Sequence, residues 1–481
     1  MTRLARLCVI VFLTHICAST ATAQTPPGQS AQMPQDAPPS ASSMLPFQDA
    51  YSVYRNLESG NFFWGGLGIT YFNNQLFYTV SLAPELAFGQ FGIGIDLNLR
   101  ISQSGQLRQE DWNDGISSYL RLIRYARYGF KQEPLYARYG QLDAARLGHG
   151  SIMFLYRNNG SYDARRVGFE FDMDFGDAGF ETIVSDLSTF NIVGIRPFVR
   201  PLRNSGLFLL SGLEIGATFV GDFNSNSNLQ AGSEATLTGR TENGQAIFDL
   251  DAATRRSSFL AFGIDAGLPI VRLPMINSDL YLDGVGYVGY GVGVAAGISA
   301  NIQAILNVLV VSAKLEQRLF TDRFQFAYFD AIYEQDRFRA IGGGAITRAN
   351  ELANTKGGAG VYGELGGSIL GIIRLYGSYQ RLYATPRAGQ LHLAARLQSN
   401  DLPVLLRADY FKRDLGVETD LFTVDDRSLG QAEFGYLPYP YLLVSVLYQW
   451  SFTPVRGENN TILGYRPLER IEPRVSLNVR F

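Results

Sequence analysis

The chain ends in the sequence Val475-Ser476-Leu477-Asn478-Val479-Arg480-Phe481, in which apolar and polar residues alternate without a break. Successive side chains of a β-strand point to opposite faces, so this period of two predicts a strand with one apolar and one polar face. The apolar face carries the odd-numbered residues Val475, Leu477, Val479 and Phe481. The polar face carries Arg474, Ser476, Asn478 and Arg480.

A terminal strand of this kind, ending on an aromatic residue, resembles the closing strand of bacterial outer-membrane β-barrels. In that class the strand is also the signal that the barrel-assembly machinery reads. The resemblance implies that Val475, Leu477, Val479 and Phe481 face lipid and form the assembly signal. It further implies that the polar face lines a lumen and that the protein resides in the outer membrane of a Gram-negative envelope.

The N-terminal residues indicate export. Arg3 and Arg6 precede a short apolar stretch, residues 7–18, and Ala21-Thr22-Ala23 has the small-x-small pattern of a cleavage site. We therefore expect residues 1–23 to be a signal peptide. Both cysteines, Cys8 and Cys17, lie within it, so we expect neither disulfides nor thiolate metal sites in the mature chain.

The composition favours a membrane barrel. Aromatic residues make up 13% of the chain, with 26 Tyr, 32 Phe and 51 Gly, which suits a barrel with aromatic girdles. No run of 18 apolar residues follows the signal, which excludes transmembrane helices. The formal net charge of −3 becomes −5 without Arg3 and Arg6, so no nucleic-acid partner is indicated.

The rest of the chain divides into two parts. Residues 24–58 are rich in Pro, Gln, Ser and Ala and predict a flexible periplasmic arm. Residues 59–481 predict an all-β domain, a single transmembrane antiparallel β-barrel of roughly 16–18 strands at the length that a tilted strand needs. The tight turn Asn73-Asn74 is expected at the periplasmic rim. Three long polar insertions are expected as outer loops: Gly221–Arg256, Gln335–Lys356 and Asp414–Ser428.

Interior segments support the barrel independently of the terminal strand. In residues 166–175, for example, Val167, Phe169 and Phe171 alternate with Arg166, Glu170 and Asp172. Residues 93–102 and 390–397 also place charge on the face opposite their apolar residues. A packed sandwich core does not tolerate buried charge this often, whereas a water-filled lumen does.

Arginine dominates the basic residues, since only four of the 41 are lysine: Lys131, Lys314, Lys356 and Lys412. Genomic base composition is one explanation, and an arginine network inside a pore is the other. The candidate lumen or constriction residues are Arg196, Arg200, Arg166, Asp172, Asp96, Arg407 and Asp409. Facing walls of opposite charge would set the field at a constriction. The sequence leaves open a salt-bridge network that merely fills the lumen.

His149 and Ser151 are the one candidate catalytic pair. On a strand they share a face, so His149 could act as the general base for Ser151. The arrangement resembles the dyad of outer-membrane phospholipases and lipid A deacylases, but those phospholipases have Asn directly after the Ser, where this chain has Ile152. We therefore expect His149 in a turn or lumen, and no enzyme.

Metals and cofactors are not expected. The mature chain has two histidines, His149 and His392, without ligand spacing around them. The acidic run Asp420–Asp426 is expected to be a solvated loop rather than a calcium site.

The sequence thus predicts a porin-like channel for passive diffusion of small hydrophilic solutes through a charged, Arg-rich lumen. Its expected partners are outer-membrane lipid, the barrel-assembly machinery and the solutes. The alternatives are a non-conducting barrel with a binding, adhesion or envelope-structural role and, less favoured, a lipolytic enzyme that uses His149 and Ser151.

Overall fold

The computed structural model describes residues 61–480 except 73–74, 113–115, 132, 160–165, 208, 226–235, 241–245, 250–257, 305–307, 342–343, 384–387, 399–401, 426 and 457–461. The predicted signal peptide, the predicted arm and Phe481 therefore lie outside the described residues. Within the described part, no helix is long and apolar enough to cross a membrane.

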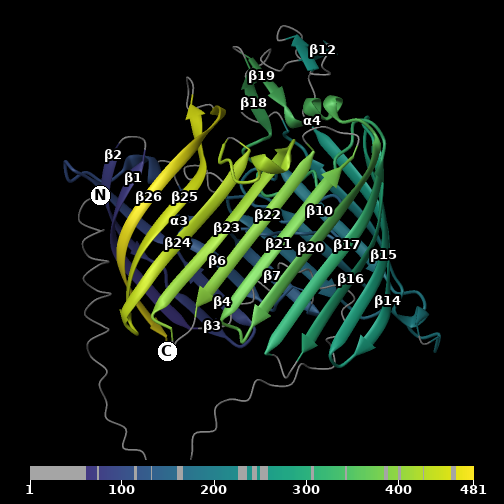
Figure 1. Cartoon of the computed structure of the whole chain (residues 1–481), viewed down its shortest axis with the longest axis horizontal. Coiled ribbons are helices and arrows are strands. Elements are labelled where there is room, and N and C mark those ends of the chain that lie inside the picture. The colour runs from purple at the N-terminus through teal and green to yellow at the C-terminus, as the bar shows by residue number, and fades with distance from the viewer. Residues whose placement is uncertain are drawn as a thin grey trace, which may run out of the picture. The chain divides into compact units, whose positions relative to one another are not determined.

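One antiparallel sheet of 22 strand segments dominates the described part of the chain (Figure 1). Its first eleven segments are β1 (Phe62–Phe72), β2 (Gln75–Leu82), β3 (Glu85–Phe88), β4 (Phe91–Ile95), β5 (Leu97–Ser102), β6 (Ile123–Tyr128), β7 (Leu135–Gly140), β8 (Gly168–Asp174), β9 (Ala178–Val184), β10 (Ile192–Val199) and β11 (Glu214–Asp222). The other eleven are β14 (Phe259–Leu273), β15 (Ile276–Tyr287), β16 (Val292–Ala304), β17 (Leu309–Phe320), β20 (Gly358–Ile369), β21 (Ile373–Leu382), β22 (Gly389–Gln398), β23 (Val404–Leu415), β24 (Ser428–Tyr439), β25 (Leu442–Arg456) and β26 (Ile462–Arg480).

The remaining elements are short. Two hairpins stand apart from the main sheet: β12 (Thr236–Arg240) with β13 (Ala246–Asp249), and β18 (Phe338–Ile341) with β19 (Gly344–Thr347). The helices are α3 (Ile116–Leu120), α4 (Arg348–Glu351), η1 (Gln109–Asp111), η2 (Leu210–Gly212), η3 (Leu352–Asn354) and η4 (Glu418–Asp420).

The sheet closes on itself through its first and last strands. β1 pairs with β26 from Phe62↔Arg480 to Tyr71↔Ile471, so the predicted all-β antiparallel barrel is confirmed. The pairs β2–β5 and β3–β4 keep one register, which makes these four segments a single interrupted hairpin. The 22 described segments therefore form 20 continuous strands (22 − 2), more than the roughly 16–18 predicted. The count fell short because strands such as β6–β9 are only six or seven residues long and show few periods.

The connections differ in length at the two ends of the barrel (Figure 1). Residues 274–275, 370–372 and 440–441 are short turns at the end where β26 finishes. The opposite end carries connections 223–258, 321–357 and 416–427, so the three predicted outer loops share one end. β1 ends and β2 begins at that same end, because consecutive strands alternate in direction. The turn Asn73-Asn74, which was predicted at the periplasmic rim, lies outside the described residues.

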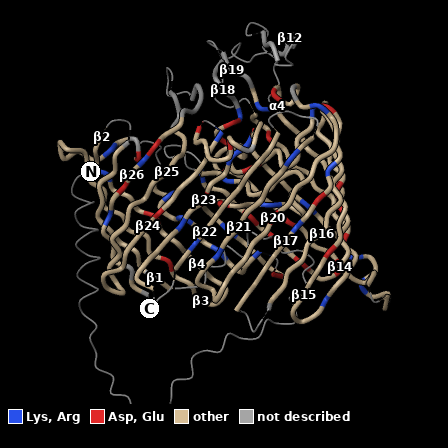
Figure 2. The backbone as a smooth tube through the Cα atoms, viewed as in Figure 1, with Lys and Arg blue, Asp and Glu red and all other residues tan. Residues whose placement is uncertain are grey.

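The outer face of the barrel is an apolar belt. On β15, Leu280 and Leu282 are exposed, whereas the alternating Asp279 and Asp283 are buried. Val475, Leu477 and Val479 on β26 are exposed as predicted, and Ser476 is buried. Figure 2 shows charged residues along the strands as well as in the connections. A barrel with apolar side chains outside and charged side chains inside is membrane-embedded, and barrels of this kind span outer membranes, so the chain is an outer-membrane protein.

Two connections fold back into the lumen. Residues 142–158, between β7 and β8, form the first inner segment, and residues 324–337, between β17 and β18, form the second. Almost all of their side chains are buried. Together with wall residues they contribute to a cluster of 23 buried hydrophobic residues. The inner segments were not predicted: the second insertion was expected to begin at Gln335, but β17 already ends at Phe320.

The apolar belt yields a stability prediction. Leu282→Arg places a cation on the outer face near the middle of β15, where burying charge in lipid costs about 2–4 kcal/mol. Val417→Arg, at an equally exposed residue in the connection after β23, is the matched control and should cost close to nothing. Denaturant unfolding of the protein from lipid vesicles measures both. Equal stability of the two variants would contradict the assignment of this face to lipid.

Candidate functional site

The two inner segments are bonded to each other by backbone. Met153 and Phe329 form a parallel β-bridge. The Phe154 N–H donates to the Phe329 carbonyl at 3.1 Å, and the Phe329 N–H donates to the Ile152 carbonyl at 3.2 Å. The Ala327 N–H donates to the Ser151 carbonyl at 2.9 Å. These bonds satisfy buried backbone groups that a lumen loop otherwise leaves to water.

Aromatic rings and buried ion pairs fix the second segment, and Asp330, Glu334 and Asp336 each pair with an arginine outside it. Tyr328 stacks on Phe259 of β14 with ring centroids 4.0 Å apart. Glu334, 2% exposed, accepts hydrogen bonds from the Tyr156 hydroxyl of the first segment and pairs with Arg166. Burial raises the pKa of the Tyr156 phenol, so the hydroxyl stays protonated as a donor. The two segments and the chain entering β8 therefore share one buried charge.

Four strands of the wall hold the first inner segment. The Gly148 N–H donates to Glu181 of β9 at 2.9 Å, and Lys314 Nζ of β17 donates to the His149 carbonyl at 2.7 Å. Arg157 pairs with Asp409 of β23 at 2.7 Å. The fourth contact joins His149 and Ser151 to Asp283 of β15. Gly148 has φ +54°, and a Cβ there would lie 2.8 Å from Arg196 Nε, so glycine lets the backbone approach the wall.

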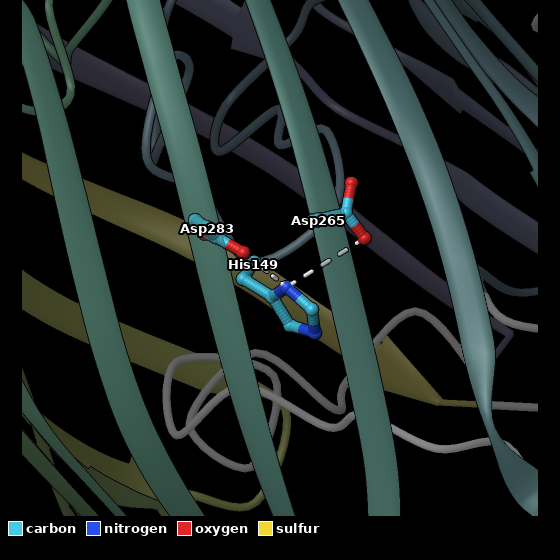
Figure 3. A group of neighbouring side chains, drawn as sticks. All are labelled: His149, Asp265 and Asp283. Carbon is cyan, nitrogen blue, oxygen red and sulfur yellow. Dashed lines mark hydrogen bonds and ion pairs between the residues drawn. The ribbon is translucent and has the colours of Figure 1, made fainter.

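His149 lies on a four-residue patch that we call the imidazole cradle: Asp265 and Gly267 on β14, and Tyr281 and Asp283 on β15. Asp265 pairs directly with Asp283, and Gly267 pairs with Tyr281. The imidazole stacks on Tyr281 at 4.2 Å, and its Nδ1 lies 2.7 Å from Asp283 and 3.8 Å from Asp265 (Figure 3). A Cβ at Gly267 would lie 3.3 Å from His149 Nε2, so the missing side chain leaves room for the ring.

Arg196 and Arg200 lie among carboxylates beside this cradle. Arg196 donates to Asp265 through Nε at 2.9 Å and Nη2 at 2.5 Å, and to Glu214 at 2.8 Å. It also reaches Glu181 at 3.1 Å, and Arg200 pairs with Asp174 and Glu214 at 2.8 Å each. Both guanidinium groups lie over the Phe198 ring, 5.3 and 4.9 Å from its centroid. Planar bidentate groups of this kind hold several carboxylates in a fixed array.

A cavity of about 60 Å³ lies between these side chains and the first inner segment. Its lining includes Arg196, Arg200 and Asp172, three of the seven predicted lumen residues, together with Arg146 and Lys131. A water molecule occupies about 30 Å³ of liquid, so the cavity suits a few waters or the polar end of a small solute.

The other predicted lumen residues are not part of this group. Arg166 pairs with Glu334, and Asp409 contacts Arg157 and, at 3.3 Å, His392. Arg407 lies 3.8 Å from Glu433, and Asp96 accepts from Asn98 at 2.6 Å. Acidic and basic residues interleave on the same strands, so the expected facing walls of opposite charge are wrong.

Several buried wall charges escaped the sequence analysis. Lys314, Glu316 and Arg318 alternate along β17, and Glu316 pairs with both cations. Lys314 Nζ lies 5.2–5.4 Å from the rings of Phe154, Tyr281 and Tyr362. The charge at every second residue of 314–318 was a usable signal, but the same stretch is flanked by residues that are apolar on both faces.

His149 and Ser151, the candidate catalytic pair, are brought together by a shared partner, Asp283. Asp283 accepts from the Ser151 hydroxyl with one oxygen and contacts His149 Nδ1 with the other. The carboxylate therefore lies between the imidazole and the hydroxyl, whereas general-base catalysis places the imidazole between the other two groups.

The acidic loop was expected to be a solvated run rather than a calcium site, and its carboxylates instead form ion pairs. Arg427 pairs with both Asp420 and Asp425, and Lys412 pairs with Asp425 at 3.2 Å. Partial burial opposes ionisation, but hydrogen bonds from Arg427 and Lys412 lower the pKa of Asp425 to about 2. These carboxylates serve as partners for side-chain cations.

Comparisons with known proteins give fold neighbours only. No protein-family model matches the chain, and no curated protein matches its sequence. Pseudomonas aeruginosa OccK11 (OpdR) is 11% identical, with 91% of this chain and 100% of that chain covered and a TM-score of 0.29. Pseudomonas aeruginosa OccK9 (OpdG) is 11% identical, with 88% of this chain and 98% of that chain covered and a TM-score of 0.31. The ferric-catecholate import receptor Fiu from E. coli K12 is 10% identical, with 87% of this chain and 81% of that chain covered and a TM-score of 0.32. Similarity this low identifies neither a family nor a solute.

The wall contacts of the first inner segment predict its local stability. Lys314→Met removes a charged donor from the His149 carbonyl, an interaction worth about 1.5–3 kcal/mol, so amides of residues 142–158 should exchange about 10- to 100-fold faster. Hydrogen exchange read by mass spectrometry measures this. The control is Lys356→Met, since Lys356 and its partner Asp322 are both more than half exposed. Equal exchange in the two variants would show that Lys314 does not hold the segment.

Proposed function

We propose that the protein is a solute channel that passes small hydrophilic solutes along a narrow charged path beside its inner segments. The observation that carries the proposal is the cavity at Arg196 and Arg200, which lies between the charged wall and the first inner segment. Another part of the lumen holds the cluster of 23 buried hydrophobic side chains. A path of this kind favours selective, low-conductance passage over the wide passive pore expected from the sequence.

The chemistry of the wall supports a wet path. Buried ion pairs can often be replaced by apolar residues of similar volume without loss of stability. A barrel that served only as a scaffold would therefore have no need of Arg196, Arg200 and their carboxylates in its lining. Because both signs of charge line the cavity, we infer weak ion selectivity and discrimination mainly by size and by hydrogen bonding.

A second candidate function is a non-conducting barrel. The bonded inner segments and the cluster of 23 buried hydrophobic residues favour it, since they fill part of the described lumen. Such a barrel would use its outer connections for binding or adhesion. In both cases the proposed partners include outer-membrane lipid on the apolar belt and the barrel-assembly machinery at the terminal strand.

Catalysis is not part of the proposal. Ser151 and His149 both contact Asp283, and this geometry supplies the hydroxyl with a carboxylate rather than with an imidazole base. Ser151→Ala should therefore leave any phospholipid hydrolysis in purified samples at the level of the parent protein. A loss of hydrolysis in this variant alone would contradict the assignment.

Planar-bilayer recording separates a channel from a closed barrel. We expect small, reproducible conductance steps from the parent protein. Replacing residues 144–157 by a short Gly/Ser linker should raise the step size several-fold, because it removes most of the first inner segment from the lumen. Migration on gels before and after boiling shows that the variant is still a folded barrel. Absence of steps from both folded proteins would contradict the channel and favour the closed barrel.

Ion preference tests whether the cavity at Arg200 lies on the conducting path. Arg200→Gln removes one cation from Asp174 and Glu214 at the edge of the cavity, so reversal potentials should shift toward cation preference. The matched control is Arg203→Gln, since Arg203 is 48% exposed and lies 3.7 Å from an exposed Asp177. Identical reversal potentials in the two variants would place Arg200 away from the conducting path.

A further inference from the structure

We propose that His149, Asp265 and Asp283 bind one divalent transition-metal ion of the zinc type, which fastens the first inner segment to the wall. The inference goes beyond the proposed function, because a channel and a closed barrel could each contain such an ion. It rests on three features: the spacing of the ligand atoms, the imidazole cradle, and the excess of negative charge around it.

The ligand atoms are close enough for a single ion. The side-chain nitrogen and carboxylate oxygens of the three residues all lie within 4.8 Å of one another. Zinc binds histidine nitrogen and carboxylate oxygen at about 2.0–2.2 Å in tetrahedral geometry, so two ligand atoms of one ion lie about 3.3–3.6 Å apart. His149 Nδ1 lies 2.7 Å from Asp283 and 3.8 Å from Asp265, so side-chain shifts of about 1 Å bring the three residues to tetrahedral spacing.

The cradle aims one ring nitrogen at both carboxylates. Stacking on Tyr281 and the open space above Gly267 fix the plane of the imidazole. Asp265 and Asp283 are directly opposite each other on neighbouring strands, both about 95% buried, and His149 Nδ1 lies on the same side as their oxygens (Figure 3). Like charges at directly opposed positions repel, and Arg196 supplies one cation to this pair, on the side of Asp265. Figure 3 shows the His149 ring between the two carboxylates, with dashed lines from its Nδ1 to each.

The surrounding charges do not cancel. The cavity lining and the cradle together hold seven carboxylates and four side-chain cations, an excess of three negative charges (7 − 4) before His149, and Lys314 on its carbonyl, are counted. The carboxylates are those of Glu133, Asp172, Asp174, Glu181, Glu214, Asp265 and Asp283, and the cations are Lys131, Arg146, Arg196 and Arg200. Buried charge of one sign needs compensation, and a divalent ion supplies two positive charges.

Arg196 and Ser151 are compatible with this role. Arg196 donates two hydrogen bonds to Asp265, and the Ser151 hydroxyl donates one to Asp283. An ionised carboxylate has about four lone-pair positions, so Asp265 and Asp283 each keep free positions for a metal. Partners of this type orient the ligands and are typical of metal sites.

The donor set selects the class of metal. One imidazole nitrogen with two carboxylate oxygens suits zinc or a neighbouring transition metal. Magnesium and calcium prefer six or more oxygen ligands, which the three side chains do not supply. A fourth position would fall to water from the adjacent cavity.

Calorimetric titration of the chelator-treated, folded full chain in detergent micelles tests the site. We expect one saturable zinc ion per chain and no comparable binding of magnesium. His149→Gln and Asp283→Asn should each weaken zinc binding about 100-fold or more, because even residues that only hydrogen-bond to the metal ligands contribute about 10- to 100-fold. His392→Gln is the matched control and should bind like the parent, since His392 faces one carboxylate, Asp409, which Arg157 already neutralises. X-ray absorption of the zinc-loaded parent should show an imidazole ligand, independently of any variant.

Three outcomes would overturn the proposal. The parent could fail to bind zinc in a saturable manner, the His149→Gln variant could bind it as tightly as the parent, or the absorption spectrum could lack imidazole. If zinc does not bind while His149→Gln speeds exchange of residues 142–158, the cradle is an imidazole latch without metal. Gel migration before boiling confirms that each protein tested is folded.

Discussion

Neutralisation of buried charge is the constraint on which the interior of this barrel depends. The wall strands alternate, so each lipid-facing apolar residue is matched by a lumen-facing polar one, and many of those are ionised and buried. Adjacent strands cannot satisfy all of them, as the opposed Asp265 and Asp283 show. The missing partners come from the inner segments, through His149 and Arg157. Wall and inner segments are therefore one electrostatic unit.

The lumen has a dry centre and charged margins. Aromatic side chains such as Tyr328 and Phe329 pack with wall residues into the central cluster. Around it, charged contacts at Lys314, Asp283 and Glu334 tie the segments in place. Any solute path runs along these margins, where the cavity at Arg196 lies. Local opening of the first inner segment would widen that path without unfolding the barrel.

The barrel could be predicted from the sequence, whereas the two inner segments that occupy its lumen could not. Alternation along residues 166–175 and in the terminal strand depends only on the strand period, so it is visible locally. The inner segments depend on contacts between residues far apart, such as His149 with Asp283 and Tyr156 with Glu334. The run Phe324–Arg337 is also rich in aromatic residues, which is equally typical of a strand. Gly148 and Gly150 indicate a turn, and both have positive φ. The two glycines do not indicate the direction in which the chain turns.

Ordered inner segments close the middle of the lumen, and the reactivity of a thiol placed between them measures that closure. The described residues contain no cysteine, so a single Met153→Cys variant places one reporter at the bridge between the two segments. In intact outer membranes it should react with a small hydrophilic maleimide orders of magnitude more slowly than Val417→Cys in an outer connection. Comparable rates for the two positions would mean that water fills the lumen at Met153, and would contradict the account.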